Sequence, residues 1–375
     1  MVTTTDSTSR VAALVAATVA VALLVGSAMA NASQPHAELA AQLKAAAASK
    51  LVVLDEAGLA RFSETASQTA TRATARVRAG QIRALQAPVI STLKRAGISA
   101  NEWRLVRAYK YVPAIAVPGN AQALRTIANL PGVRAIDSNG IRHPSLDRSA
   151  IQVGADRFRT RTYEGGNAAV AVLDTGVQSN HAIFSIKYQR LLAEGCFSVL
   201  TGFSGETLGM GCPHGDGEYP GAGAPCPLYS EQFPDNCSHG TGVAGIATGH
   251  GLSSNSQNFV GIAPNSSLVS VSVCNTVNLF ALLGGALSTT CYDSDVIAGI
   301  DFVVGLQARG VGLPIAAINL SLGGGKFRGD CTNYLRAYSA AISTARSLGI
   351  SAVAASGNDG YINDLAAPAC VRSVI

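Results

Sequence analysis

The stretch Ala168-Ala169-Val170-Ala171-Val172-Leu173, which runs directly into Asp174-Thr175-Gly176, decides the fold. A continuous apolar run that ends in a turn is typical of a strand buried on both faces of a parallel sheet. Working outward, further strands are predicted over residues 267–273, 315–320 and 350–355, and helices over residues 294–307, ending near Gly310, and 332–348, capped by Gly349. The strand at 315–320 is expected to stop before Gly323-Gly324-Gly325. This alternation indicates an α/β fold with a doubly wound parallel sheet and helices on both faces.

Polar residues stand at the ends of these segments. Asp174 ends the first strand and Asn358 follows the last one, while His239 lies in Ser238-His239-Gly240-Thr241-Gly242, a pattern typical of a helix start. Because ligands bind at the carboxyl ends of the strands in doubly wound sheets, a site is expected there. Each motif alone has an ordinary explanation, since a lone histidine is usually a surface or helix-terminal residue and an asparagine after glycine usually belongs to a turn. Asp-Thr-Gly also marks aspartic proteases, but those pair two such carboxylates and this sequence has only one such motif.

Taken together, the motifs resemble those of the subtilisin-like serine proteases. The resemblance covers residues 146–375 and rests on Asp174-Thr175-Gly176, His239-Gly240-Thr241, Asn319-Leu320-Ser321-Leu322-Gly323-Gly324 and Ser356-Gly357-Asn358. It implies an endopeptidase in which Asp174 orients His239, His239 acts as general base, and Asn358 donates a hydrogen bond to the oxyanion. It also implies that Ser321, Leu322 and Gly323 pair with the substrate backbone as an added strand. Substrate binding is further assigned to Gly324, Ser356 and Gly357, and Gly323 and Gly324 leave room for a side-chain pocket.

The sequence departs from the family pattern at two places. Gly242 stands where the family usually has a second histidine. More importantly, no segment matches the family's Gly-Thr-Ser-Met/Ala-x-Pro nucleophile motif, and Ser373 lies in residues 371–375, which resemble the strand before that motif. We therefore expect a fragment of a longer protease that is itself inactive. Two alternatives stay open: a non-catalytic, subtilase-like binding or inhibitory protein, and, more distantly, an aspartic protease.

The N-terminus has the pattern of a secretory signal peptide. Arg10 precedes the apolar run 11–25, and small residues with A-x-A spacing follow up to Ala32. We assign residues 1–32 to the signal and expect a secreted protein. The alternative, a membrane anchor, is disfavoured because the run is shorter than the roughly 20 residues that a span needs. No stable membrane anchor is therefore expected.

Residues 33–145 resemble the family's propeptide, especially over 109–136, which implies a small α+β domain of ferredoxin-like type. Helices are predicted over 36–50, 65–86 and 121–130, strands over 51–54 and 133–136, and a bent strand or hairpin over 103–117. This region carries 15 Lys or Arg against 6 Asp or Glu, whereas residues 146–375 carry 12 against 16. The opposite net charges favour docking of the two regions, with the linker 139–148 running through the cleft and a processing bond near residues 142–150. The basic residues lack interleaved aromatics, so nucleic acid is not an expected partner.

All eight cysteines follow residue 195. An even number of cysteines in an exported chain predicts disulfides, but eight cysteines allow 105 pairings, so the connectivity is open. Proximity suggests the pairs Cys196–Cys212, Cys226–Cys237, Cys274–Cys291 and Cys331–Cys370.

No cofactor is required by this chemistry. Calcium is common in the family, but Ile183 stands where a carboxylate ligand is expected at that offset from Asp174, so no metal site is assigned. The cysteines lack Cys-x-x-Cys spacing, which disfavours zinc. The expected partners are polypeptide substrates and the chain's own propeptide, and we expect a monomer.

Overall fold

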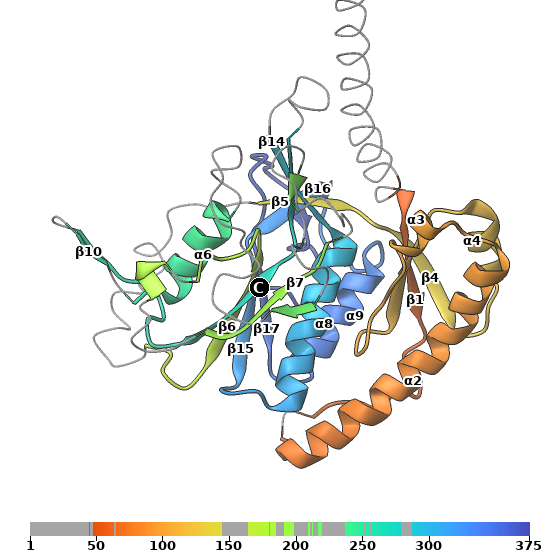
Figure 1. The fold of residues 1–375 in the computed structure, drawn as a ribbon, viewed down its shortest axis with the longest axis horizontal. Helices are drawn as coiled ribbons and strands as arrows, with labels where there is room; N and C mark the ends of the chain where they lie inside the picture. The colour runs from red at the N-terminus through yellow and green to blue at the C-terminus, as the bar shows by residue number, and fades with distance from the viewer. Residues whose placement is uncertain are drawn as a thin grey trace, which may run out of the picture.

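The computed structural model describes residue 45 and residues 48–63, 65–144, 164–179, 181–184, 191–198, 209–210, 212, 217–219, 237–250, 252–254, 257–278 and 287–375. The expected signal segment 1–32 and most of the expected helix 36–50 lie outside these residues. Figure 1 shows two parts side by side, a small one containing α2 and α4 and a larger one containing α6, α8 and α9.

A six-stranded sheet forms the centre of the larger part. Its strand order is β17-β15-β6-β12-β7-β9, and all neighbours are parallel except β9, which runs antiparallel to β7. The strands are β6 (Ala169–Asp174), β7 (Leu191–Cys196), β9 (Gly217–Tyr219), β12 (Ser267–Ser272), β15 (Ile315–Leu320) and β17 (Ser351–Ala354). The predicted parallel strands are therefore present, in a sheet that is mixed at one edge.

Helices cover both faces of this sheet. Ala171 and Leu173 of β6 belong to the apolar cluster that includes residues of α8 (Asp293–Arg309) and α9 (Arg336–Arg346). The intervening Val172 packs instead with Val243 and neighbouring residues of α6 (Ser238–Thr248). Successive side chains of a strand point to opposite faces, so β6 is buried on both sides, as its apolar sequence predicts. α8 ends at Gly310 in the left-handed conformation, with φ of 66°, which is the predicted helix end.

A second sheet, with strand order β18-β16-β5-β14-β13-β8, was not expected from the sequence. Its strands are β5 (Ile141–Pro144), β8 (Gly209–Met210), β13 (Asn275–Asn278), β14 (Leu287–Tyr292), β16 (Leu322–Phe327) and β18 (Leu365–Ala367). The predicted strand 315–320 does end at Leu320, but Gly323-Gly324-Gly325 do not interrupt strand structure, because these glycines lie inside β16. β5 and β18 pair with β16 on its two sides, and these partners hold a glycine-rich segment extended despite its low intrinsic preference. The predicted helix 332–348 is also shorter than expected, because residues 332–335 form a turn after the disulfide-bonded Cys331.

The smaller part has the element order β-α-β-β-α-β and an antiparallel sheet with strand order β2-β3-β1-β4. Its main elements are β1 (Lys50–Leu54), α2 (Gln68–Arg95), β2 (Arg107–Ala108), β3 (Ala114–Val117), α4 (Ala121–Ile127) and β4 (Val133–Ser138). The short helix α3 (Ala100–Trp103) precedes β2. The predicted elements between residues 51 and 136 are present, with α2 extending nine residues beyond its predicted end at Gln86.

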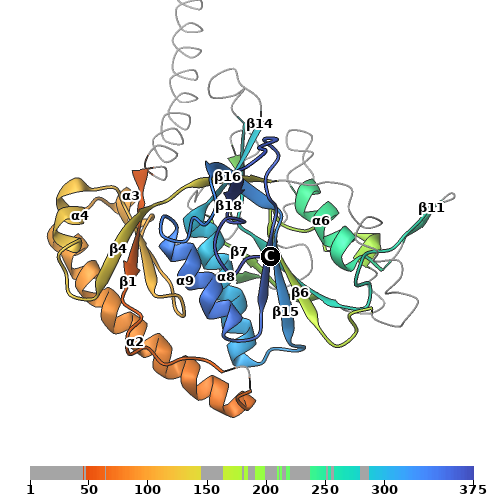
Figure 2. The same cartoon turned by 180° about the vertical axis from the view of Figure 1, so that it is seen from behind.

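Both faces of this sheet are buried. Val52 and Leu54 of β1 pack under α2 and α4, with Leu93 and Ile127 among their neighbours. Leu51 and Val53, on the opposite face, belong to the same apolar cluster as residues of α8 and α9. The two views in Figures 1 and 2 agree that this sheet lies beside α9. The smaller part is therefore packed onto the two helices that cover one face of the central sheet.

Candidate active site

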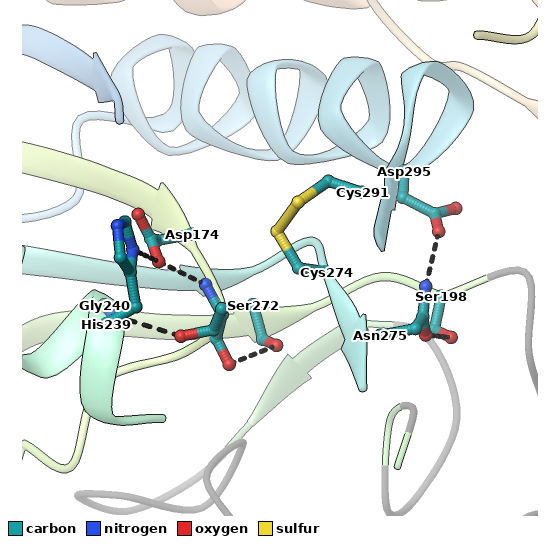
Figure 3. The surroundings of a disulfide bond; sticks show 10 residues. Asp174, Ser198, His239, Gly240, Ser272, Cys274, Asn275, Cys291 and Asp295 are labelled. Carbon is teal, nitrogen blue, oxygen red and sulfur yellow. Dashed lines mark hydrogen bonds and ion pairs between the residues drawn. A yellow bond between two sulfur atoms is a disulfide. The ribbon is translucent and has the colours of Figure 1, made fainter. Parts of the chain in front are cut away.

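Asp174 and His239 meet at the carboxyl end of β6. Asp174 is fully buried, and its Oδ1 atom lies 2.7 Å from Nδ1 of His239 in the first turn of α6 (Figure 3). The same carboxylate oxygen accepts a hydrogen bond from the backbone N–H of Thr175, at 2.7 Å. Two donors therefore fix one carboxylate oxygen. With the Nδ1 proton donated to Asp174, the imidazole presents Nε2 as a proton acceptor.

The two motifs can approach this closely because Gly240 has no side chain. A Cβ atom at Gly240 would lie 2.2 Å from the carbonyl oxygen of Gly176, which is well inside van der Waals contact. The Gly240 N–H also donates to Oγ1 of Thr175 at 3.0 Å, and the N–H of Gln178 donates to Oγ1 of Thr241 at 2.9 Å. Hydrogen bonds between residues of the two sequence motifs thus hold the end of β6 against the start of α6.

His239 Nε2 is buried and has no hydrogen-bond partner among the described residues, and the same holds for Oδ2 of Asp174. A buried polar atom without a partner is costly, so native structures rarely leave one unless the position has a role. An imidazole held on one side by a carboxylate, with its other nitrogen free, can take up a proton from a hydroxyl group.

The segment that was expected to bind a substrate backbone is already paired with the chain's own strand β5. Gly323 pairs with His143 and Leu322 with Pro144, in antiparallel register. On its other side β5 pairs with β14, where Cys291 is opposite Arg142. Of the linker 139–148, which was expected in the cleft, residues 141–144 form β5 and lie between these two strands, and residues 145–148 lie outside the described residues.

The remaining predicted site residues lie near β16 without joining the Asp174–His239 pair. Ser321 precedes β16 and accepts a hydrogen bond from the side chain of Asn319, and Gly324 pairs with Ala367 of β18. Ser356, Gly357 and Asn358 follow β17, and Asn358 is exposed with no hydrogen bond to another described residue. Gly357 has a φ of 106°, which favours glycine. The backbone N–H of Ala366 donates to the Ser356 carbonyl, so this loop is tied to β18.

Disulfides crosslink segments of the larger part of the molecule. The structure contains Cys196–Cys212, Cys274–Cys291 and Cys331–Cys370, three of the pairs suggested by proximity. Cys237 is also disulfide-bonded, but its suggested partner Cys226 lies outside the described residues. Cys274–Cys291 joins the segment after β12 to β14, the strand that borders β5 (Figure 3).

Sequence reasoning missed the side chains that join the two parts of the molecule. Asp301 of α8 accepts backbone hydrogen bonds from Lys110, Tyr111 and Val112 at 2.9, 2.6 and 2.9 Å. Burial nevertheless raises the pKa of the Asp301 carboxyl above its ordinary value, against the opposing effect of these three donors. Asp137 of β4 accepts hydrogen bonds from the first backbone N–H groups of α9, those of Arg336 and Ala337.

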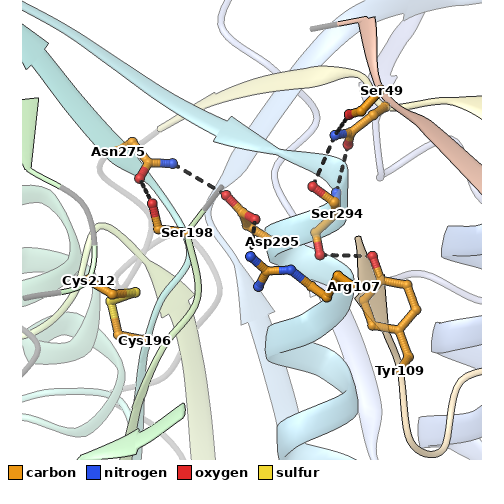
Figure 4. Close-up of polar contacts among 10 residues, drawn as sticks. Ser49, Arg107, Tyr109, Cys196, Ser198, Cys212, Asn275, Ser294 and Asp295 are labelled. Carbon is orange, nitrogen blue, oxygen red and sulfur yellow. Dashed lines mark hydrogen bonds and ion pairs between the residues drawn. A yellow bond between two sulfur atoms is a disulfide. The ribbon is translucent and has the colours of Figure 1, made fainter. Parts of the chain in front are cut away.

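Arg107 and Asp295 form a third link (Figure 4). Arg107 Nη2 lies 3.2 Å from Oδ1 of the fully buried Asp295, and the Asn275 amide donates to the other oxygen of that carboxylate at 3.3 Å. Such pairs join residues nearly 200 positions apart, so no local pattern in the sequence could have indicated them.

Comparison with known proteins identifies the family of the larger part of the chain. The model of the subtilase family matches residues 165–375, more than half of the chain. The chain belongs to the subtilase family. This subtilase is 24% identical over 273 residues to subtilisin E of Bacillus subtilis (strain 168), and the match covers 72% of the chain and 56% of that protein. It is 25% identical over 216 residues to a subtilisin of Bacillus pumilus, covering 58% of the chain and 56% of the relative. The chain thus spans about half of the length of the curated relatives it matches.

Solved structures of related proteases also match the subtilase. The epidermin leader peptide processing serine protease from Staphylococcus aureus has a TM-score of 0.46 and 16% identity, and the match covers 87% of this chain and 68% of that one. Fervidolysin from Fervidobacterium pennivorans, described as a keratinolytic enzyme, has a TM-score of 0.45 and 18% identity, with 86% and 41% of the two chains covered. Among the described residues, none of the helices is long and apolar enough to cross a membrane, and no three His, Cys, Asp or Glu side chains gather as a metal site would require.

Proposed function

We propose that this subtilase serves as a secreted serine endopeptidase in which Asp174 and His239 activate a serine that is not among the 375 residues. The observation that carries the proposal is the 2.7 Å contact between Asp174 and His239, with the Nε2 atom of His239 buried and without a partner among the described residues. In this role His239 takes the proton of the serine hydroxyl as it attacks the scissile carbonyl, and Asp174 stabilises the imidazolium that forms. His239 then donates that proton to the leaving amine.

Ser373 is a poor candidate for the nucleophile. The backbone groups of Ile375 hydrogen-bond to Ala352 and Ala354, and Val374 bridges to Ala352 in a parallel arrangement. Ser373 lies in the turn before this pairing, with a φ of 82°, and no hydrogen bond links it to His239. The pairing of Val374 and Ile375 with β17 supports a strand that begins here and precedes the nucleophile segment, whereas residues 371–373, which were also expected in that strand, form a turn.

In the same proposal, Ser321, Leu322 and Gly323 bind the substrate backbone, and Asn358 donates to the oxyanion. The pairing of β5 with Leu322 and Gly323 supports the first role, because it displays an extended peptide bound to this segment as an added strand. Asn358 follows β17 on an exposed loop tied to β18, a position that a substrate could reach. Loss of one oxyanion donor costs roughly 10²–10³ in rate in serine proteases.

The proposal assigns residues 33–145 to an inhibitory propeptide of ferredoxin-like type. The β-α-β-β-α-β order of the described elements supports the type, and the strand β5 in the substrate segment supports the inhibitory role. The hydrogen bonds from Lys110, Tyr111 and Val112 to Asp301 supply an anchor on α8. Residues 1–32 would direct export, after which a cut beyond β5 would free the cleft.

A fluorophosphonate probe tests the catalytic part of the proposal. The 375-residue chain should remain unlabelled and should not hydrolyse casein, whereas the product of the extended reading frame should be labelled at one serine. Labelling of that product should disappear in His239→Ala and persist in the control His181→Ala. Labelling of Ser373 in the 375-residue chain would overturn the external nucleophile, and an unlabelled extended product would favour the non-catalytic alternative.

A further inference from the structure

A cavity of about 430 Å³ lies at the junction of the two parts, away from Asp174 and His239. It is lined by residues of α2, of the turn between β2 and β3, and of the last turn of α8. Figures 1 and 2 both place the N-terminal end of α2 beside the C-terminal end of α8. Its volume is within the roughly 300–1,000 Å³ range of small-molecule sites.

The two helix ends that form this cavity are held together by side chains. Gln68 Nε2 donates to the carbonyl of Ala308 at 3.4 Å, and Arg72 Nε donates to the carbonyl of Arg309 at 3.0 Å. The last carbonyl groups of a helix carry partial negative charge, and these two are already paired. Arg72 is thereby fixed by one nitrogen, which leaves the terminal nitrogens of its guanidinium for another acceptor.

Four cationic side chains line the cavity: Arg72, Arg76, Lys110 and Arg309. No carboxylate is among the described residues that line it, and the other lining residues are Ala75, Tyr111 and Ala308. Arg72 and Arg76 are four residues apart on α2, a spacing at which like charges repel. This concentration of positive charge in a concave site favours the binding of an anion.

The nearby carboxylates do not neutralise the four cations. Glu218 contacts only Arg309, at 3.2 Å, and both side chains of that pair are half-exposed, so the pair is weak. Asp301 accepts the three backbone hydrogen bonds described above and is not among the residues that line the cavity, so of the four cations its charge acts on Lys110 alone. The side chains of Arg76 and Lys110 make no hydrogen bond or ion pair with another described residue. The Lys110 ammonium lies over the ring of Tyr111, at 5.2 Å, and its charge attracts the Asp301 carboxylate without a direct contact.

We propose that this cavity binds a multivalent oxyanion of the phosphate type. Arginine guanidinium groups match phosphate oxygens with paired N–H donors, and lysine adds a point charge. Three of the cations belong to the smaller part and Arg309 to the subtilase part, so a bound anion would bridge the two. This inference goes beyond the proposed function, and its test needs no proteolytic activity.

Titration of the 375-residue chain with sodium tripolyphosphate, followed by calorimetry and thermal unfolding at constant ionic strength, tests the site. We expect saturable binding and a higher unfolding temperature, because a ligand that binds only the native state stabilises it. Arg76→Gln should weaken binding about tenfold, the loss of one charged contact. The matched control is Arg83→Gln, which removes the same charge from the same helix two turns away and outside the cavity.

Three results would overturn the proposal. The first is an equal temperature shift with sodium chloride at the same ionic strength, since that would reduce the effect to screening. The second is unchanged affinity in Arg76→Gln, or equal weakening in Arg83→Gln. The third is binding of phosphatidylglycerol vesicles without binding of tripolyphosphate, which would assign the cations to a membrane surface.

Discussion

Gly323 of β16 is paired with His143 of β5, so the segment that follows the smaller part along the chain is a strand of the second sheet, beside the residues expected to bind a substrate backbone. β5 is covered on its other side by β14, whose Cys291 is bonded to Cys274. The space between β16 and β14 is thus filled by the chain's own strand, and β14 is held by a disulfide.

The 375-residue chain should remain uncut near residues 142–150, where the processing bond is expected. The reason is the absence of a nucleophile that His239 could activate. Intact-mass spectrometry of the purified chain should find only the loss of the signal segment. Efficient self-cleavage of the purified chain would contradict the assignment of the nucleophile to a segment outside these residues.

Gly323→Val should weaken the pairing of β16 with β5. The added Cβ would lie 3.1 Å from Cβ of Ala366 and 3.3 Å from the Ala367 carbonyl oxygen, so β16 and β18 must adjust by a few tenths of an ångström, and we expect the register with β5 to be disturbed. Cleavage by added trypsin after Arg142 should speed up on the order of tenfold, a local opening that costs about 1.4 kcal/mol less. Gly80→Ala, where a Cβ meets nothing within 4 Å, is the control. Equal cleavage rates in both variants would refute the role of the pairing.

Gly240→Ala should separate Asp174 from His239. Its Cβ would meet the backbone carbonyl of Gly176 at 2.2 Å, and such overpacking costs about 1–3 kcal/mol. The low-field proton resonance expected for the His239 Nδ1–H bonded to Asp174 should be lost or strongly shifted. Gly245→Ala is the matched control on the same helix, because its Cβ would meet only the end of the Ile183 side chain, at 3.1 Å. A retained resonance in Gly240→Ala would show that the approach tolerates a side chain.

Asp301→Asn should flatten part of the pH dependence of stability. Burial raises the pKa of Asp301, so its contribution is fully present below the ordinary carboxyl pKa and is lost as the pH rises through the higher folded-state pKa. The free energy of unfolding of the native chain, relative to Asp301→Asn, should therefore fall as the pH increases above about 4. Urea unfolding of both proteins between pH 4 and pH 8 measures this difference. Parallel curves would mean that Asp301 keeps an ordinary pKa.

Removal of the Cys331–Cys370 disulfide by double alanine substitution should lower the free energy of unfolding by about 4 kcal/mol, because its loop spans 39 residues. The same change at Cys196–Cys212, which spans 16 residues, should cost about 3 kcal/mol. Denaturant unfolding of the two variants under identical conditions checks the order. A larger loss at the shorter loop would show that strain or packing, and not chain entropy, decides the effect.

The central strands and the pair Asp174 and His239 could be predicted because their signals are local. The apolar run before Asp174 is buried on both faces of the sheet. Gly240, the residue after His239, is required by one close contact with the Gly176 carbonyl oxygen. In both cases the residues that carry the signal are adjacent in the sequence to the site residue. β16 could not be predicted, because its glycines are held extended by partners that come from residues 141–144 and 365–367. The hydrogen bonds that Asp301 and Asp137 accept could not be predicted either, because the donors lie about 190 to 200 residues away along the chain. In each case the deciding interaction is distant along the chain.

The burial of β1 on both faces has a consequence for synthesis on the ribosome. Val52 and Leu54 pack against α2 and α4, which lie within the next eighty residues of the chain. Leu51 and Val53 can be covered only after α8 and α9 have been synthesised. The contact between Tyr109 and Ser294 spans 185 residues, which takes roughly 10–40 s to translate at ordinary elongation rates. During that interval the nascent smaller part carries an uncovered apolar face, which makes it prone to aggregation until α8 and α9 are synthesised.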